Sequence, residues 1–145
     1  KLIQLLGESE TVGTEKYFNN EYVIIPNGQE LNKKSQLQKK DPILTVGFIG
    51  RIDIQTKGLD ILVQGLKKVV KTIEIKLQII GSNGDMNALK KLVKLNGLQN
   101  NVEFMGAQFG EDKLRIMSRW NALCLTSRNE GLPGVVLEAA SIGVP

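Results

Sequence analysis

The sequence has 145 residues, a hydrophobic fraction of 41% and a charged fraction of 23%, which is the size and composition of one compact globular domain. With no histidine and a single cysteine, the sequence excludes Ser–His and Cys–His catalytic pairs, an internal disulfide framework and a thiolate metal site. No run approaches the roughly 18 apolar residues of a membrane-spanning helix, and the start lacks the pattern of a signal peptide.

The net charge of +4 comes from 19 basic and 15 acidic residues. Much of the excess lies in two lysine-rich stretches, residues 33–40 and 67–76. Solvated surface is one interpretation of these stretches, and attraction to anionic lipids or to a polyphosphate ligand is the other. We expect no nucleic-acid binding, because aromatic residues are not interleaved with the basic ones.

The chain is predicted to begin with a segment outside the main pattern and then to alternate strands with helices. Residues 1–21 fit no repeating pattern, residues 22–25 are predicted to form a strand that ends at Pro26-Asn27-Gly28, and residues 28–41 are a polar surface excursion. From residue 43 on, short apolar runs predict buried strands, and apolar residues spaced along one face predict helices. The predicted strands are 43–49, 75–80, 102–105 and 122–126, and the predicted helices are 59–70, 86–95, 111–120 and 135–140, the last with Pro133 in its first turn.

Strands joined by helices of about ten residues favour right-handed crossovers and a mainly parallel α/β sheet. Ligands of such sheets bind beyond the carboxyl ends of the strands. The segments that follow the predicted strands are all rich in glycine or polar residues, and we expect a ligand site among them. They are residues 50–58, 81–85, 106–110 and 127–134.

Two cations flank the first of these loops. Gly50-Arg51 ends the strand, and Lys57-Gly58 precedes the helix. A glycine lets a ligand approach the backbone, and a helix start offers free N–H groups. Arg51 as a planar fork and Lys57 as a point charge could hold a diphosphate between them. The other interpretation is an exposed loop with two unrelated surface cations.

Two carboxylates lie near the end of the chain with seven residues between them: Glu130 in a loop and Glu138 in the apolar helix that follows. A buried carboxylate without a partner is unfavourable, so Glu138 needs one. Sugar hydroxyls can donate hydrogen bonds to carboxylates, and Gly134 would let a phosphate reach the helix amides. Solvent or a structural lysine could satisfy Glu138 instead.

Two further features favour ordinary structural roles. The turn at residues 81–85 lacks the Gly-x-Gly-x-x-Gly spacing of dinucleotide sites and the Gly-Lys-Ser/Thr of a P-loop, so a plain tight turn is the simpler interpretation. Cys124 lies inside an apolar run and is expected to be an inert core thiol.

Together, and in this order along the chain, these motifs resemble the C-terminal, donor-binding domain of family 4 retaining glycosyltransferases (glycosyl transferases group 1), which have two Rossmann-like domains in the GT-B fold. The motifs are Pro26-Asn27-Gly28, Gly50-Arg51 with Lys57-Gly58, the Ile-Ile-Gly-x-x-Gly-Asp turn at residues 79–85, residues 101–106, and residues 127–145 with both glutamates. The resemblance implies a Rossmann-like α/β/α domain with a mainly parallel sheet, one half of a GT-B fold. It covers residues 22–145 and is truncated at its C-terminal end, with residues 1–21 as a remnant of the preceding domain or a linker.

The resemblance implies an enzyme that moves a hexosyl group from a UDP- or GDP-sugar to an acceptor with retention of configuration. It places Arg51 and Lys57 at the donor diphosphate as catalytic charges, Glu130 at the donor sugar as a catalytic residue, and Glu138 at the ribose hydroxyls. The other donor-binding residues that it implies are Gly81, Gln108, Gly134, Val135 and Val136.

The resemblance also implies catalysis without a metal or a tightly bound cofactor, and a saccharide or lipid-linked acceptor that a separate N-terminal domain binds. It implies a cytoplasmic enzyme, with peripheral association at the inner membrane face as a further option. We expect these 145 residues alone to be inactive, because the reaction needs its groups enclosed between two domains. A nucleotide-sugar epimerase or phosphorylase of the same architecture, and a non-catalytic nucleotide-binding module, are the alternatives.

Overall fold

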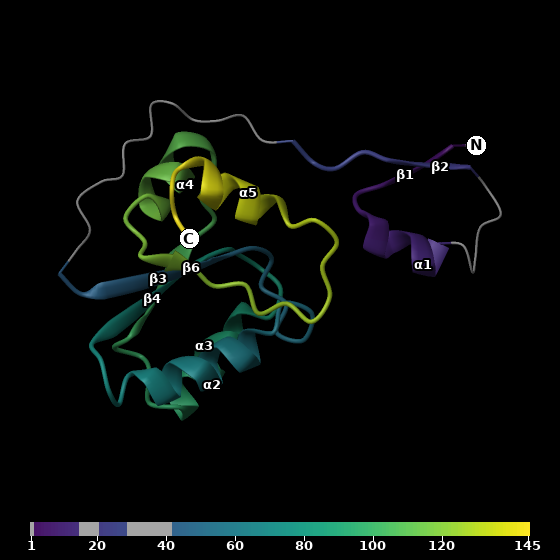
Figure 1. Ribbon diagram of the computed structural model, residues 1–145. Coiled ribbons are helices and arrows are strands. Elements are labelled where there is room, and N and C mark those ends of the chain that lie inside the picture. Colours follow the sequence, from purple (N-terminus) through teal and green to yellow (C-terminus); the bar gives the residue numbers. More distant parts are fainter. Residues whose placement is uncertain (1, 15–20, 29–41) are drawn as a thin grey trace.

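The computed structural model describes residues 2–14, 21–28 and 42–145 of the chain (Figure 1). The polar excursion predicted at residues 28–41, apart from its first residue, and the lysine-rich stretch at 33–40 lie outside these described residues. In the second lysine-rich stretch, Lys67, Lys68, Lys71 and Lys76 are all exposed, as expected of a solvated surface.

A short parallel sheet lies near the N-terminus. It consists of β1 (Ile3–Leu5) and β2 (Tyr22–Ile24), and β1 is followed by η1 (Glu8–Glu10) and α1 (Thr11–Thr14). The strand predicted at residues 22–25 is confirmed to within one residue. The elements before it were missed, because β1 has three residues and its partner strand lies far along the chain. This segment reaches the loop at residues 130–132, where the Asn27 amide donates a hydrogen bond to the Leu132 carbonyl oxygen at 3.2 Å.

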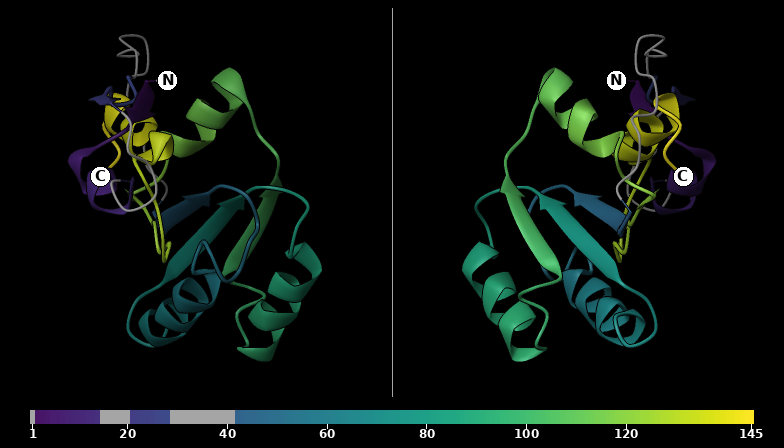
Figure 2. Two further views of the ribbon diagram at one scale, coloured as in Figure 1. Left: turned by 90° about the vertical axis from the view of Figure 1, so that its right-hand side faces the viewer. Right: turned by 90° about the vertical axis from the view of Figure 1, so that its left-hand side faces the viewer.

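The main sheet has four parallel strands in the order β5-β4-β3-β6. They are β3 (Leu44–Ile49), β4 (Ile75–Ile80), β5 (Val102–Gly106) and β6 (Ala122–Leu123). Two helices, α2 (Leu59–Val69) and α3 (Met86–Leu95), cover one face, and α4 (Gly110–Met117) and α5 (Gly134–Ser141) cover the other (Figures 1 and 2). The predicted Rossmann-like three-layer arrangement is confirmed.

Each face of the sheet has its own core. Between the sheet and α2 and α3, the buried residues include Phe48, Leu77, Leu62 and Val93, which follow the predicted strand and helix patterns. The smaller core beneath α4 and α5 has Trp120 at its centre. The Trp120 indole is fully buried, and its Nε1 donates a hydrogen bond to Oε1 of Gln78 at 2.8 Å, so its polar atom is satisfied. The sheet is therefore held from both sides.

Two predicted elements are shorter in the structure. The helix predicted at residues 111–120 ends at Met117, because the chain then turns and the Asn121 side chain accepts a hydrogen bond from the Thr45 amide at 2.9 Å. The strand predicted at 122–126 has only the two residues of β6. Beyond Cys124, whose amide still bonds the Gly47 carbonyl oxygen, the chain leaves the sheet and approaches the start of α2.

Cys124 is half-buried against the larger core rather than fully buried. Burial raises the pKa of its thiol, which keeps the thiol protonated near neutral pH and agrees with the expected inert role.

The sheet order places the sequence reversal between β3 and β6. From β3 the chain proceeds through α2, β4 and α3 to β5, and then crosses the other face through α4 to β6. The loops after β3 and β6 therefore face each other at the switch point, where sheets of this kind bind ligands.

Candidate functional site

A pocket of about 620 Å³ opens at the carboxyl ends of β3, β4 and β5. The starts of α4 and α5 complete its wall. Six of the residues predicted to bind a ligand contribute to the lining: Arg51, Gly81, Gln108, Gly134, Val135 and Glu138. The predicted residues Lys57, Glu130 and Val136 do not line it, and the first two meet each other in the adjacent crevice between the β3 and β6 loops.

The lower wall of the pocket is a backbone contact between two loops. A Cβ on Gly81 would overlap the carbonyl oxygen of Gly50 and would lie 2.7 Å from Cδ1 of Ile52. The Asp85 amide donates to the Ile52 carbonyl oxygen at 2.8 Å, and the Ile54 amide donates to the Asp85 carboxylate at 3.0 Å. This close packing alone requires glycine at position 81, which supports the interpretation of residues 81–85 as a tight turn, here one that also forms a wall.

The opposite wall is the start of α5. Pro133 has an extended backbone and precedes the helix rather than lying within its first turn, as the sequence had suggested. The helix begins at Gly134, where a Cβ would meet no atom within 4 Å. The first amides of a helix lack partners within the helix, so this glycine leaves free donors facing open space.

Glu138 lies one turn further along α5 and forms an ion pair with Lys113 of α4. Nζ of Lys113 donates to Oε1 of Glu138 at 2.8 Å, and the two side chains are 20% and 26% exposed. Both residues line the pocket. Glu138 thus has a lysine partner, which was one of the two alternatives that the sequence left open.

The sequence analysis did not single out Lys113 or Phe109. Lys113 lies in a helix with mixed charges, and its partner is 25 residues away, so no local pattern connects them. Phe109 lies at the pocket with 79% of its surface exposed, directly before α4. An aromatic residue in a polar loop after a strand was the one signal that could have identified it.

In the crevice, Lys57 and Glu130 form a short ion pair. Nζ of Lys57 lies 2.6 Å from Oε1 of Glu130, and the hydroxyl of Ser127 donates to the same oxygen at 2.6 Å. The two side chains are 20% and 23% exposed. The hydrogen bond from Lys57, and then the one from Ser127, lower the pKa of the Glu130 carboxyl below its usual value. Glu130 is therefore ionised at neutral pH.

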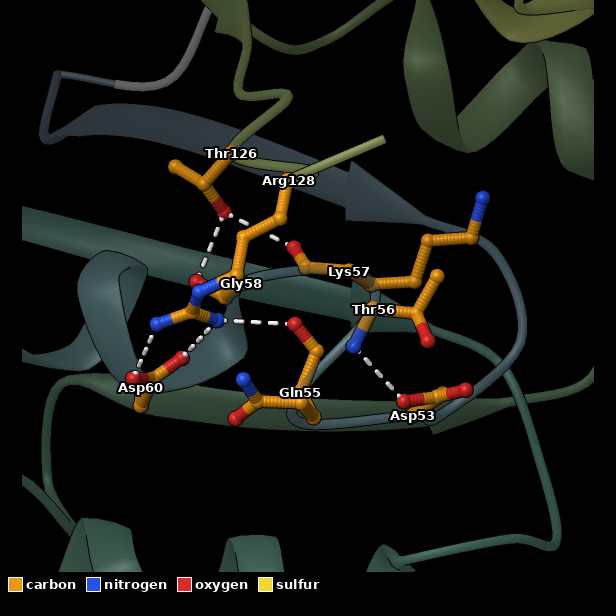
Figure 3. A network of polar contacts seen from close by, with 8 residues as sticks. All are labelled: Asp53, Gln55, Thr56, Lys57, Gly58, Asp60, Thr126 and Arg128. Atoms are coloured by element: carbon orange, nitrogen blue, oxygen red, sulfur yellow. Dashed lines mark hydrogen bonds and ion pairs between the residues drawn. The ribbon is translucent and has the colours of Figure 1, made fainter. Parts of the chain in front are cut away.

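The backbone around Lys57 is fixed by the β6 loop (Figure 3). Gly58 has a left-handed backbone with φ of 60°, and a Cβ there would overlap the Thr126 carbonyl oxygen. The Thr126 hydroxyl lies 3.1 Å from the carbonyl oxygen of Lys57 and 2.9 Å from that of Gly58. These contacts leave little freedom at the start of α2.

Arg128 fastens the same two loops from the other side (Figure 3). Its guanidinium binds both carboxylate oxygens of Asp60, at 2.8 and 2.7 Å, and also the Gln55 carbonyl oxygen at 2.8 Å. Its backbone amide donates to the Thr56 carbonyl oxygen at 2.9 Å. The bond from Arg128 lowers the pKa of the Asp60 carboxyl. A bidentate pair of this kind fixes geometry as well as charge.

Arg51 is exposed at the pocket and takes part in none of the ion pairs found among the described residues. The same part of the chain holds no cluster of three or more side chains able to ligate a metal, so metal independence stays a prediction. None of the described helices has the length and apolar character to cross a bilayer.

A family-wide sequence model described as glycosyl transferases group 1 matches residues 43–145. An uncharacterized glycosyltransferase of Haemophilus influenzae is 30% identical over 148 aligned residues, which is 100% of this chain and 40% of that protein. An uncharacterized glycosyltransferase of Methanocaldococcus jannaschii is 32% identical over 142 residues, which is 90% of this chain and 34% of that protein. The chain thus spans well under half the length of these relatives.

The fold is similar to that of TarM from S. aureus, whose crystal structure contains fondaparinux, α-GlcNAc-glycerol and UDP. The two structures agree with a TM-score of 0.85 at 22% identity, over 98% of this chain and 28% of TarM. The fold is one Rossmann-like half of the GT-B arrangement.

Proposed function

The chain belongs to the glycosyl transferases group 1 family, and from that membership we propose that it carries the donor-binding site of a glycosyltransferase that uses a nucleoside-diphosphate sugar. The observation that supports this most is the pocket itself. It lies at the carboxyl ends of parallel strands beside the switch point, with Arg51 on one wall and the open start of α5 on the other. The presence of UDP in the TarM crystal structure agrees with a nucleotide donor.

In this proposal the diphosphate lies between Arg51 and the amides at Gly134 and Val135. Both walls offer positive charge or N–H donors to an anion, and neither closes the space between them. Lys57 lies in the adjacent crevice and completes the charge on that side. Because Lys57 is paired with Glu130, a diphosphate competes with that carboxylate for the ammonium group.

The nucleoside occupies the other end of the pocket. Glu138 accepts hydrogen bonds from the ribose hydroxyls, and the base lies against the loop at Gln108, whose amide is held by the Met105 carbonyl oxygen at 2.8 Å. The exposed ring of Phe109 beside it offers an apolar face to a base. UDP and GDP are both compatible with this arrangement.

For the reaction, we propose a retaining hexosyl transfer of the family 4 type. Glu130 orients the hydroxyls of the donor sugar, and Val136, 41% exposed on α5, lies on the same side of the helix start as the other contacts. As the bond between the sugar and the diphosphate breaks, negative charge grows on the departing nucleoside diphosphate, and Arg51 and Lys57 stabilise it. These cations take the role that a metal has in other transferases, so the reaction is proposed to be metal-independent.

The whole enzyme is proposed to bind a saccharide or lipid-linked acceptor through a separate N-terminal domain, in the cytoplasm or at the inner membrane face. Residues 22–145 are then the donor-binding domain, and residues 1–21 belong to the preceding domain or a linker.

The test is calorimetric titration of the chain with UDP, GDP and ADP. We expect one of them to bind, and expect Arg51→Ala and Glu138→Ala to abolish that binding. Lys91→Ala is the matched control, since it removes an exposed cation on α3 outside the pocket. A folded wild-type chain that binds none of the three nucleotides, or an equal loss in the control variant, would contradict the proposal.

A further inference from the structure

We infer that Lys113 is a positioning residue for the nucleoside: its ammonium group holds the Glu138 carboxylate in the orientation that accepts the ribose hydroxyls. The inference rests on the proposed function and adds to it a residue from a different helix.

The geometry of the ion pair leaves Glu138 with capacity to bind a ligand. Lys113 donates to Oε1, and no other contact between described residues involves Oε2. A carboxylate can accept about four hydrogen bonds, so one ammonium donor leaves room for the two hydroxyls of a ribose. Lys113 therefore fixes the carboxylate without blocking it.

The helices that carry the pair are themselves well anchored. α4 and α5 pack in one core, where Met117 of α4 and Ala139 of α5 are buried and Leu114 and Val135 pack against them. Lys113 is adjacent to Leu114, and Glu138 is adjacent to Ala139, so both side chains project from fixed backbone. A lysine held in this way loses less freedom on pairing than one at an open surface.

Charge gives the pair a second consequence. Glu138 lines the same pocket as the proposed diphosphate site, and an unpaired carboxylate there would repel an anionic ligand. Lys113 neutralises that charge while keeping the oxygens available. This separates it from Arg51 and Lys57, whose charge is proposed to act on the diphosphate directly.

A direct contact between Lys113 and a phosphate is the competing explanation, and a double-mutant cycle distinguishes the two. If Lys113 acts through Glu138, then Lys113→Met has an effect in the wild-type background and little further effect in Glu138→Gln. If Lys113 contacts the phosphate itself, the two losses add. The ligand also discriminates, because a residue that orients Glu138 matters only for nucleotides with ribose hydroxyls.

The experiment is calorimetric titration of the chain with UDP and GDP and with 2′,3′-dideoxy-UDP and 2′,3′-dideoxy-GDP. For the nucleotide that binds, we expect Lys113→Met to weaken affinity by about tenfold, the size of one charge-assisted hydrogen bond, and Lys113→Arg to retain most of it. For the matching dideoxy nucleotide we expect a change below about threefold. Lys113→Gln serves as a second variant if the Met variant does not fold.

Three results would overturn the inference: wild-type affinity in Lys113→Met and Lys113→Gln, equal losses for the ribose and dideoxy nucleotides, or additive losses with Glu138→Gln. Any of these can occur while the wild-type chain binds UDP or GDP, and the proposed function then still holds. A wild-type chain that binds neither contradicts the proposed function instead.

Discussion

The two ends of the segment from Glu130 to Glu138 have the same chemistry in different settings. Each glutamate pairs with one lysine, at 2.6 Å for Lys57 and 2.8 Å for Lys113, and all four side chains have similar exposure. At the crevice end the ion pair lies among loops that are held by close backbone contacts. At the pocket end it lies beside open space.

The difference shows that an ion pair does not by itself reveal what its members do. Lys57 is proposed to bind the diphosphate, so its pairing with Glu130 opposes ligand binding. Lys113 is proposed to support Glu138, so its pairing assists ligand binding. Changes at the two ends should therefore differ in their effect on stability and in the sign of their effect on affinity.

The largest expected effect is on stability at the crevice end. Gly58→Ala places a Cβ on a left-handed residue and against the Thr126 carbonyl oxygen, and we expect it to reduce the free energy of unfolding by about 3 kcal/mol. Urea denaturation measures this. Gly65→Ala is the matched control, because Gly65 lies within α2 with no atom near its missing Cβ, and alanine there should stabilise by up to about 1 kcal/mol. Equal stability of the two variants would contradict the close contact at Gly58.

Much of the fold that creates this contrast could be predicted from the sequence. The spacing of apolar residues identified α3 at its observed bounds and α2 to within one residue, since each buries one face against the sheet. The ends of α4 and β6 could not be predicted, because they depend on the bond between Asn121 and Thr45, which joins distant parts of the chain.

The site shows the same limit. Arg51, Gly134 and Glu138 meet in one pocket, as expected of loops that follow parallel strands. The partner of each glutamate could not be predicted, because Lys113 is 25 residues from Glu138 and Lys57 is 73 residues from Glu130. Such pairs become visible only when the strand order is known.

The second prediction concerns affinity and its sign. Glu138→Gln should weaken binding of UDP or GDP by about tenfold, because an ionised acceptor becomes a neutral one. Glu130→Gln should leave affinity unchanged or raise it, because Lys57 is released from its carboxylate partner while the sugar that Glu130 is proposed to orient is absent from UDP and GDP. Calorimetry with these nucleotides measures both. A tenfold loss in Glu130→Gln would remove the proposed distinction between the two ends.

The third prediction compares two glycines at helix starts. Gly134→Ala adds a methyl group where no atom lies within 4 Å, so its stability should change by less than about 1 kcal/mol, in contrast to Gly58→Ala. The same methyl group would occupy the space proposed for the diphosphate, and nucleotide affinity should fall by several-fold. Loss of stability without loss of affinity would show that this wall serves the fold and not a ligand.

The smallest expected effect is a pH dependence of stability at the crevice end. The pKa of the Glu130 carboxyl is below its usual value of 4.5 in the folded chain, because Lys57 and Ser127 bond its ionised form. The pKa of Asp60 is likewise below 3.8, because of Arg128. A lowered folded pKa contributes stability that is present above the unfolded value and is lost as the pH falls through the folded value. Thermal unfolding between pH 6 and pH 3 should therefore show a decline that begins near pH 4.5, and Glu130→Gln should reduce its size. An unchanged decline in that variant would mean that the short distance between Lys57 and Glu130 contributes little free energy in solution, as holds for many exposed ion pairs. In that case Lys57 would be free for a diphosphate at little cost, and the two ends of the segment would differ in affinity alone.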